Sequence, residues 1–382
     1  MRAWLLPEYV EDILPPDATT IERLRRDLLE LFRVHGYELV SPPMLEYIDS
    51  LLTGTGHDLD LRTFKLIDQL SGRTMGLRAD MTPQVARIDA HLLNRAGVTR
   101  LCYCGTVVHT RPRGLTATRE PLQVGAEIYG HAGIESDLEI QRLLRAALVC
   151  CGIAEARLDI SHVGVFRALA RRGGVAGALE QDLLAVMQAK DRPGLASLTA
   201  GLARETRDAL AQLPELYGGR EALERARKEL PAYPEVQAAL ADLAALVADA
   251  NGAVSIDLGD LRGYHYHSGV VFAAYAAGHA SAVALGGRYD EVGKAFGRAR
   301  PATGFSMDLR ELVRVAPRVA KPAGAVLAPY VSDPALTEAI DRLRAAGEVV
   351  IVDMPGHEAA RGELGCDRVL VKHGPRWDVE AL

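Results

Sequence analysis

The 382-residue sequence lacks the marks of a membrane or exported protein. No apolar run approaches the length of a membrane span. The N-terminus, MRAWLLPEYVEDILPP, is interrupted by Pro7 and by acidic residues, so it does not resemble a signal peptide. We therefore expect a cytoplasmic protein that does not enter a membrane.

Cysteine is also scarce. The five cysteines, at positions 102, 104, 150, 151 and 366, are too few for a disulfide framework in a chain of this size. Cys102 and Cys104 would share one face of a strand, but no second Cys/His pair completes a zinc set. We expect reduced thiols that serve as small apolar residues, and no metal site.

An excess of positive charge is missing as well. Forty-four Lys and Arg stand against fifty Asp and Glu, which gives a net charge of −6. Proteins devoted to nucleic acids are more often basic, so this balance leans mildly against such a role, although an acidic protein can bind RNA through a local patch. No P-loop and no G-x-G-x-x-G motif follows a predicted strand, and no cofactor is expected.

Two pairs of strands and one long helix can be predicted from local patterns. RTFKLID and TMGLRAD flank Ser71-Gly72 in the manner of a hairpin, and residues 100–112 and 119–130 form a second antiparallel pair around a polar loop. In TTIERLRRDLLELFRVHG, apolar residues recur at helical spacing. Thr19 and Glu22 have the spacing of a capping box, which predicts that this helix begins at Thr19.

The composition changes between about Ala168 and Asn251, where the chain is rich in Ala, Leu, Glu and Arg. This predicts a helical insertion, with strand patterns before and after it. We therefore predict an α+β fold, an antiparallel sheet flanked by helices. Residues 1–320 would form this core, with the insertion at 168–251, and residues 321–382 a small C-terminal α/β unit.

Polar residues gather in three segments: LRADMT (Leu77–Thr82), EPLQVGAE (Glu120–Glu127), and LRGYHYHSG (Leu261–Gly269) with GGRYD (Gly286–Asp290). Gln123 and Glu127 are four apart, so on a strand both face the same way. Carboxylates bind an ammonium group and Arg262 can bind a carboxylate, which together suit a zwitterion. Any one residue alone would more often form a surface salt bridge. The convergence of three segments favours a binding site.

His265 and His267 have the H-x-H spacing of two metal ligands on one strand. No third ligand is evident in the sequence. We therefore prefer the interpretation that they are polar residues lining a cleft.

From about Pro16 to Val315, the order of elements and the three polar segments resemble the catalytic core of class II aminoacyl-tRNA synthetases, specifically histidyl-tRNA synthetase. LRADMT resembles the family's RPEGT, LQVGAEIYG its HQLGCEVFG, and RGYHYH its RGLDYY, and GGRYD is matched in full. GYELVSPPMLEY resembles motif 1, whose helix and strand form the family's dimer interface.

The resemblance implies a histidine site. In it, Asp80 and Thr82 would bind the α-amino group, and Gln123 and Arg262 the carboxylate. Glu127, with Tyr266 or His267, would contact the imidazole. His267 stands where the synthetases have the second tyrosine of DYY, so the contact it makes would differ from theirs.

The positions that bind ATP in the synthetases differ more. Val108 occupies the motif 2 arginine position, Thr110 the motif 2 glutamate position, and Glu311 the motif 3 arginine position. Cations placed at a developing phosphate charge are what stabilise adenylation, so these replacements are expected to cost several kcal/mol and to repel the triphosphate. Arg310 lies one position from the motif 3 site, a turn of roughly 100° on a helix.

A chain with the histidine residues, without the ATP arginines and with a short tail resembles one paralogous family, the regulatory subunits of short-form ATP phosphoribosyltransferase. The resemblance implies a non-catalytic subunit that assembles with a separate catalytic subunit, self-associates through the motif 1 elements into a hetero-octamer, and transmits feedback inhibition by free L-histidine. tRNA is not an expected partner. The alternatives are a divergent active histidyl-tRNA synthetase and a free-standing amino-acid or tRNA sensor.

Overall fold

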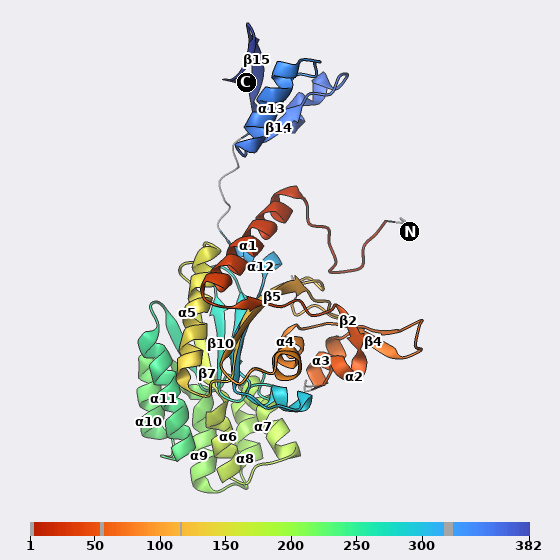
Figure 1. The fold of residues 1–382 in the computed structure, drawn as a ribbon. Helices are drawn as coiled ribbons and strands as arrows, with labels where there is room; N and C mark the ends of the chain where they lie inside the picture. Colours follow the sequence, from red (N-terminus) through yellow and green to blue (C-terminus); the bar gives the residue numbers. More distant parts are fainter. Residues whose placement is uncertain (1–3, 54–56, 115–116, 317–323) are drawn as a thin grey trace. The chain divides into compact units, whose positions relative to one another are not determined.

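The computed structural model describes residues 4–53, 57–114, 117–316 and 324–382 (Figure 1). The chain divides into two compact units, Met1–Pro317 and Arg318–Leu382. The domain boundary predicted at residues 320 and 321 lies outside the described residues. Each unit is considered by itself below.

A nine-stranded sheet forms the centre of the first unit. Its strand order is β1-β5-β6-β12-β11-β10-β7-β9-β8, and all neighbours are antiparallel except the pairs β1–β5 and β7–β9. This confirms the predicted α+β class. The strands are β1 (Glu38–Leu39), β5 (Thr99–Thr106), β6 (Leu122–Tyr129), β7 (Arg157–His162), β8 (Tyr217–Gly218), β9 (Val254–Asp257), β10 (Val270–Tyr275), β11 (Ala284–Arg288) and β12 (Ala302–Asp308).

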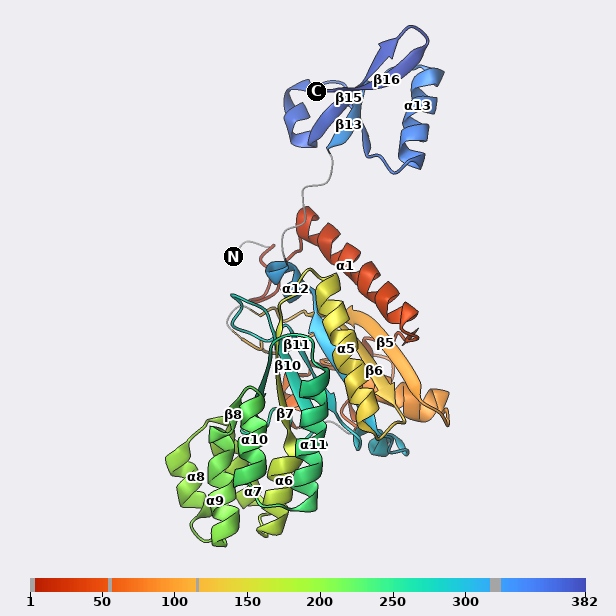
Figure 2. The same ribbon diagram turned by 90° about the vertical axis from the view of Figure 1, so that its left-hand side faces the viewer.

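Helices α1 (Pro15–Val34), α5 (Ile134–Cys150) and α12 (Leu309–Val315) pack beside one another and against strands of this sheet (Figure 2). Leu24, Leu28 and Phe32 of α1 are buried at the spacing that the sequence predicted. The predicted start of α1 at Thr19 is wrong. The helix begins four residues earlier because Pro15 and Pro16 suit its first turn, and no side chain caps it.

Six helices lie between β7 and β9 in the chain and form the helical insertion, which packs into the main hydrophobic core. Figures 1 and 2 both show them gathered at one end of the sheet. They are α6 (Val163–Arg172), α7 (Ala178–Gln188), α8 (Arg192–Thr199), α9 (Arg204–Gln212, followed by the 3-10 turn η2, Leu213–Glu215), α10 (Arg220–Glu229) and α11 (Pro234–Asp249).

A smaller core, separate from the main one, contains residues of β5 and β6 together with α4 and η3. A three-stranded sheet of order β2-β4-β3 precedes α4, and its β3–β4 pair confirms the predicted hairpin. The elements are β2 (Leu45–Tyr47), α2 (Ile48–Leu51), α3 (His57–Arg62), β3 (Lys65–Ile67), β4 (Thr74–Leu77), α4 (Thr82–Arg87), the π-helical turn η1 (Ile88–Leu93) and the 3-10 turn η3 (Val292–Phe296).

Strand β6 separates the two cores. Val124, Ala126 and Ile128 belong to the main core, whereas Tyr129 belongs to the smaller one. Because side chains alternate along a strand, Gln123 and Glu127 point to the same side as Tyr129. The polar residues of β6 therefore lie on the face that carries the smaller core.

The second unit has a four-stranded sheet of order β14-β13-β15-β16, parallel except for the antiparallel pair β15–β16. Its core includes Val326, Leu336, Ile340, Leu370 and Trp377. Among the described residues of either unit, no helix is long and apolar enough to cross a membrane. The elements are β13 (Ala325–Ala328), α13 (Pro334–Ala345), β14 (Val350–Val352), the 3-10 turn η4 (Glu358–Leu364), β15 (Cys366–His373) and β16 (Arg376–Ala381).

Candidate functional site

A buried carboxyl group, that of Glu127 on β6, is the centre of the site. Its side chain is 1% exposed. The Tyr103 hydroxyl lies 2.9 Å from Oε1, the Tyr289 hydroxyl 2.5 Å from Oε2, and the Thr82 hydroxyl 3.4 Å from Oε1. These three hydroxyls come from β5, from the end of β11 and from the start of α4, so three separate segments converge on one carboxyl group.

Burial raises the pKa of Glu127 to about 8, although hydrogen bonds from Tyr289 and Tyr103 act in the opposite direction. At neutral pH the protonated, uncharged form of this carboxyl group therefore predominates. A protonated carboxyl can donate a hydrogen bond to an imidazole nitrogen, and an ionised one can accept a hydrogen bond from an imidazole N–H.

Two glycines make room for this arrangement. Gly304 on β12 pairs with Glu127 across the sheet, and a methyl group at Gly304 would overlap the Glu127 carboxylate. Gly125 pairs with Tyr103, and a Cβ at Gly125 would lie 2.5 Å from the Tyr103 hydroxyl. The glycine in LQVGAE is thus needed because a buried tyrosine ring occupies the space that a side chain would fill.

Asp80 and Gln123 extend the site along β6. Asp80 Oδ1 accepts hydrogen bonds from the Thr82 backbone N–H at 3.0 Å and from Gln123 Nε2 at 2.9 Å. Gln123 Oε1 accepts from the Met81 N–H at 2.9 Å. Asp80 thus has neutral donors, and no cation is paired with it among the described side chains.

The structure therefore brings together four of the residues predicted from the sequence. With the two tyrosines that bond Glu127 they form what we call the polar cluster, made of Asp80, Thr82, Tyr103, Gln123, Glu127 and Tyr289. The cluster combines carboxyl groups, hydroxyls and an amide in a buried space, which suits a ligand that is itself polar and carries an ammonium group.

Tyr266 contributes an unpaired hydroxyl. Its ring lies 5.1 Å from that of Tyr289, centroid to centroid. Within the part of the chain that the structure describes, the buried Tyr266 hydroxyl has no hydrogen-bond partner. Burial raises its pKa well above the ordinary value, and the charges of Asp80 and Glu127 add to this effect. A buried hydroxyl without a partner beside these groups is the feature expected where a ligand supplies the missing partner.

His267 has a different environment. Its Nδ1 lies 3.2 Å from the Arg288 carbonyl oxygen, so that nitrogen carries the proton and donates. Burial lowers its pKa to about 4, and the ring is therefore neutral at neutral pH. No contact between His267 and the polar cluster is present among the described residues. Residues 258–269 form a turn and not a strand, and His265 within it is exposed. The strand spacing considered for His265 and His267 as two metal ligands therefore does not apply.

Arg262 lies in the same turn but is bound to its own neighbours. Its Nε donates to Asp260 Oδ2 at 2.6 Å and its Nη2 to the Tyr275 hydroxyl at 3.3 Å. Burial disfavours the charged guanidinium, but Asp260 outweighs burial and raises the pKa of Arg262. The structure does not place Arg262 in contact with the polar cluster.

The helical insertion holds the 258–269 turn. Arg167 on α6 donates from Nη2 to the carbonyl oxygens of Tyr264 and His267 at 3.0 and 3.1 Å, and from Nη1 to that of Ser268 at 3.4 Å. On α7, Glu180 accepts from the Tyr264 hydroxyl at 2.5 Å. The turn that carries Tyr266 is thus fixed by two helices outside the sheet.

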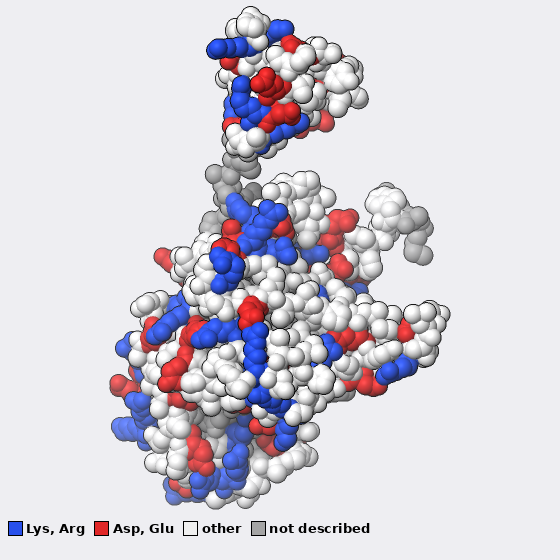
Figure 3. All heavy atoms as spheres, viewed as in Figure 1, with Lys and Arg blue, Asp and Glu red and all other residues white. Residues whose placement is uncertain are grey.

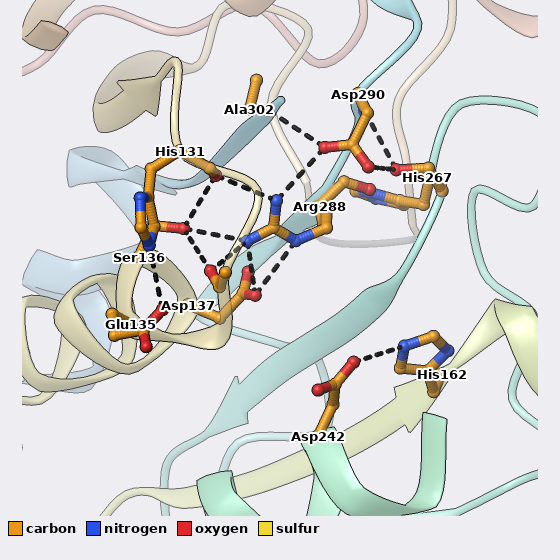
Figure 4. Close-up of polar contacts among 12 residues, drawn as sticks. His131, Glu135, Ser136, Asp137, His162, Asp242, His267, Arg288, Asp290 and Ala302 are labelled. Carbon is orange, nitrogen blue, oxygen red and sulfur yellow. Dashed lines mark hydrogen bonds and ion pairs between the residues drawn. The ribbon is translucent and has the colours of Figure 1, made fainter. Parts of the chain in front are cut away.

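Arg288 of GGRYD fixes the same region from the other side (Figure 4). Its guanidinium donates to Asp137 near the start of α5, with Nη2 2.7 Å from Oδ2, and to Asp290 at 3.2 Å from Nη1. Asp290 in turn accepts from the Ser268 hydroxyl at 2.9 Å. Arg288 therefore connects β11, α5 and the 258–269 turn, and it positions the site without entering the polar cluster.

Next to the cluster lies a cavity of about 340 Å³. Gln123 belongs to both, since it lines the cavity and donates to Asp80. Apolar residues of β11 and β12 form part of its wall, together with His109, Arg113, Asp308 and Glu311. His109 is 1% exposed, its Nε2 donates to the Ala79 carbonyl oxygen at 2.9 Å, and burial lowers its pKa to about 4.

The three replaced ATP positions are engaged in contacts with the rest of the chain. Val108 donates its N–H to the Arg78 carbonyl oxygen at 3.0 Å. The Thr110 hydroxyl donates to the Leu61 carbonyl oxygen at 2.7 Å. Glu311 accepts from Arg314 at 2.9 Å and lies 3.6 Å from His279.

Arg310, which lies one position from the motif 3 site, does not line the cavity. Its guanidinium lies 3.7 Å from Glu120. Among the described residues, Arg113 is the arginine that lines this cavity.

Sequence reasoning missed Tyr103 and Tyr289 as members of the site. Tyr103 stands between two cysteines that drew attention as thiols, and Tyr289 was part of a matched motif without an assigned contact. The alternation of β5 was a usable signal for Tyr103, since Cys102 faces the main core and Tyr103 the opposite side. Nothing local in the sequence indicates that Tyr289 reaches Glu127, because 162 positions separate them.

Comparison with protein families gives two matches. Residues 9–312 match the family model of histidyl-tRNA synthetase, and residues 323–380 match that of the ATP phosphoribosyltransferase subunit HisZ C-terminal domain. The ATP phosphoribosyltransferase regulatory subunit of Ralstonia nicotianae is 62% identical over 381 residues, which cover 100% of this chain and 98% of that protein. That of Azoarcus sp. is 58% identical, covering 99% of both chains.

Solved structures show the same fold. The crystal structure of an ATP phosphoribosyltransferase regulatory subunit/histidyl-tRNA synthetase from Bacillus halodurans C has a TM-score of 0.82 at 29% identity, covering 94% of this chain and 96% of that chain. Histidyl-tRNA synthetase from Nostoc sp. has a TM-score of 0.78 at 18% identity, covering 97% and 92%, a likeness of fold alone. This chain belongs to the family of ATP phosphoribosyltransferase regulatory subunits, which is built on the histidyl-tRNA synthetase fold.

Proposed function

We propose that this chain activates a separate ATP phosphoribosyltransferase catalytic subunit in the first step of histidine biosynthesis, binds free L-histidine as a feedback effector and catalyses no reaction itself. One contrast carries the proposal. The polar cluster around Glu127 is complete and buried, whereas Val108 and Glu311 occupy the positions where the synthetases have ATP-binding arginines.

In the proposed complex the imidazole of histidine lies at the Glu127 end. Glu127 and the unpaired Tyr266 hydroxyl bond the ring, and His267 offers its Nε2 from the edge of the site. Asp80 and Thr82 bind the α-amino group, which gives the unpaired carboxylate of Asp80 a cation. Gln123 and Arg262 face the carboxylate of the ligand, Arg262 through donors that Asp260 and Tyr275 leave available.

Adenylation is disfavoured by the charges around the cavity. Asp308 and Glu311 both line it, and a triphosphate placed there would be repelled by their carboxylates. The loss of one placed cation at a developing oxyanion costs about 100- to 1,000-fold in rate, and two positions have changed here. These charges support a subunit that binds histidine without activating it.

Feedback then follows from linkage. If histidine binds more tightly to one of two quaternary arrangements, it shifts the complex toward that arrangement, and the catalytic subunit changes the affinity for histidine by the same factor. The 258–269 turn is a suitable link, because Arg167 connects it to the helical insertion and Arg288 to α5.

Self-association is proposed through α1 and β1, within a hetero-octamer with the catalytic subunit. β1 is the edge strand of the large sheet, and its Leu39 is 59% exposed. Val34, at the end of α1, is 61% exposed. Exposed apolar residues on an edge strand favour pairing with a second copy.

tRNA is not part of the proposal. On the face shown in Figure 3, positively and negatively charged residues are intermixed over the helical insertion. With a net charge of −6, this distribution does not favour the long basic surface that RNA binding requires.

The test is reconstitution with the catalytic subunit of the same organism. We expect the two chains to copurify, turnover to rise when this chain is added, and histidine to inhibit the complex. A catalytic subunit equally active and equally sensitive to histidine without this chain would refute the proposal.

A divergent active synthetase is the competing function, and a second assay separates the two. Histidine-dependent exchange of pyrophosphate into ATP requires adenylation. We expect none above background. Robust exchange would show that Val108 and Glu311 do not prevent activation of histidine.

A further inference from the structure

The charges around the polar cluster are unbalanced for a zwitterion. Asp80 is available for an ammonium group, because it is bonded to neutral donors. The cation assigned to the carboxylate, Arg262, forms an ion pair with Asp260 and also bonds Tyr275. A bound amino acid would therefore place its carboxylate where one cation is already largely satisfied.

Arg113 is a second cation at the same site. It follows Pro112 on the loop after β5 and lines the same cavity as Gln123, which donates to Asp80. Across residues 4–53, 57–114, 117–316 and 324–382, no hydrogen bond or ion pair engages its guanidinium. Arg119, near the end of the same loop and before β6, is by contrast bonded to the His109 carbonyl oxygen at 3.0 Å.

The electrostatic surroundings of Arg113 support a missing anion. Arg113 is exposed on its loop, where the charge of Arg62 repels its guanidinium and the charges of Asp80 and Asp308 attract it without pairing. An anion beside the guanidinium would offset the repulsion from Arg62. Asp80, which accepts from Gln123, and Arg113, which lines the same cavity as Gln123, match the ammonium and carboxylate of an α-amino acid.

We propose that Arg113 binds the carboxylate of the amino-acid ligand, in place of Arg262, which Asp260 already engages. The inference rests on the proposed histidine site and names the group that distinguishes an amino acid from the corresponding amino alcohol. A planar guanidinium with two parallel N–H donors suits a carboxylate better than the neutral amide of Gln123 alone.

The experiment compares two ligands by calorimetry. L-histidine has the carboxylate, and L-histidinol has a hydroxymethyl group in its place but keeps the ammonium and the imidazole. The full-length wild-type chain is expected to prefer histidine by about 10- to 100-fold, the range for a charge-assisted pair. In Arg113→Ala that preference should fall to about two-fold, with the affinity for histidinol unchanged. Arg113→Lys should show an intermediate preference, because lysine keeps the charge but lacks the paired N–H donors of the guanidinium.

Arg111→Ala is the matched control, because Arg111 lies two residues away, is exposed and does not line the cavity. It should keep the full preference for histidine. If Arg113→Ala also keeps that preference while Arg262→Ala loses it, the carboxylate lies on Arg262 and the inference is wrong. If the wild-type chain binds neither ligand, the proposed histidine site fails, and the inference fails with it.

Discussion

The two ends of the site differ in where their polar side chains find partners. Around Glu127, hydroxyls from distant segments bond one carboxyl group and leave the Tyr266 hydroxyl unpaired. At the cavity end, Thr110 and Glu311 are bonded to neighbouring segments of the chain. The first end keeps interactions open for a ligand, whereas two of the changed positions at the second end now contribute to the fold.

The largest effect is expected from closing the space around Glu127. In Gly304→Ala a methyl group would overlap the Glu127 carboxylate across the β6–β12 pair. We expect histidine affinity to fall by about 100-fold or more, because overpacking a buried site displaces the groups that bind. Gly97→Ala is the control, since a Cβ there meets nothing within 4 Å. If calorimetry finds normal histidine binding in Gly304→Ala, Glu127 is not part of the histidine site.

Burial of the Glu127 carboxyl group should make the free energy of unfolding depend on pH. Such a dependence would show that the carboxyl group lowers the stability of the folded chain when it is ionised. Its pKa rises from 4.5 to about 8 on folding, so between these values the folded state holds a proton that the unfolded state has released. The stabilising contribution is complete below pH 4.5 and is lost as the pH rises through 8.

The uncharged Glu127→Gln should therefore be similar to wild type in stability near pH 4.5 and more stable by roughly 2 to 4 kcal/mol at pH 8.5. Urea denaturation at the two pH values measures the difference. Glu224→Gln, at an exposed position of α10, should show no such change. A Glu127→Gln variant whose stability follows wild type at both pH values would mean that the carboxyl group is not strained by burial.

A smaller effect is expected from loosening the 258–269 turn. Arg167→Ala removes three hydrogen bonds to the carbonyl oxygens of Tyr264, His267 and Ser268. We expect histidine to bind about 10-fold more weakly, since hydrogen bonds to a charged group contribute about 1.5 to 3 kcal/mol and the loss is indirect. Arg171→Ala, exposed on the same helix, is the control. Unchanged affinity in Arg167→Ala would show that the insertion does not position the turn.

The smallest effect is expected at the cavity end. Val108→Arg should change histidine affinity by no more than about two-fold, because Val108 neither bonds the polar cluster nor lines the cavity. Titration of this variant with histidine measures the change. A loss of histidine affinity comparable to that of Gly304→Ala would show that both ends of the site contribute to histidine binding.

The sequence predicted this contrast better than it predicted the contacts. Gln123 and Glu127 followed from strand alternation, a local property, and the structure places both on one side of β6. The Tyr289 contact depends on the order of strands in the sheet, which no local pattern contains. Arg262 was predicted to bind the carboxylate of the ligand, and its pairing with Asp260 two residues away became visible only because residues 258–269 form a turn.

The most direct test is the histidine concentration that half-inhibits the reconstituted complex. Asp80→Asn removes the charge proposed to bind the α-amino group while keeping an oxygen for the Thr82 N–H. With this variant we predict that activation of the catalytic subunit is retained and that the half-inhibiting concentration rises at least about 10-fold. Unchanged inhibition by histidine would contradict the claim that this pocket is the sensor.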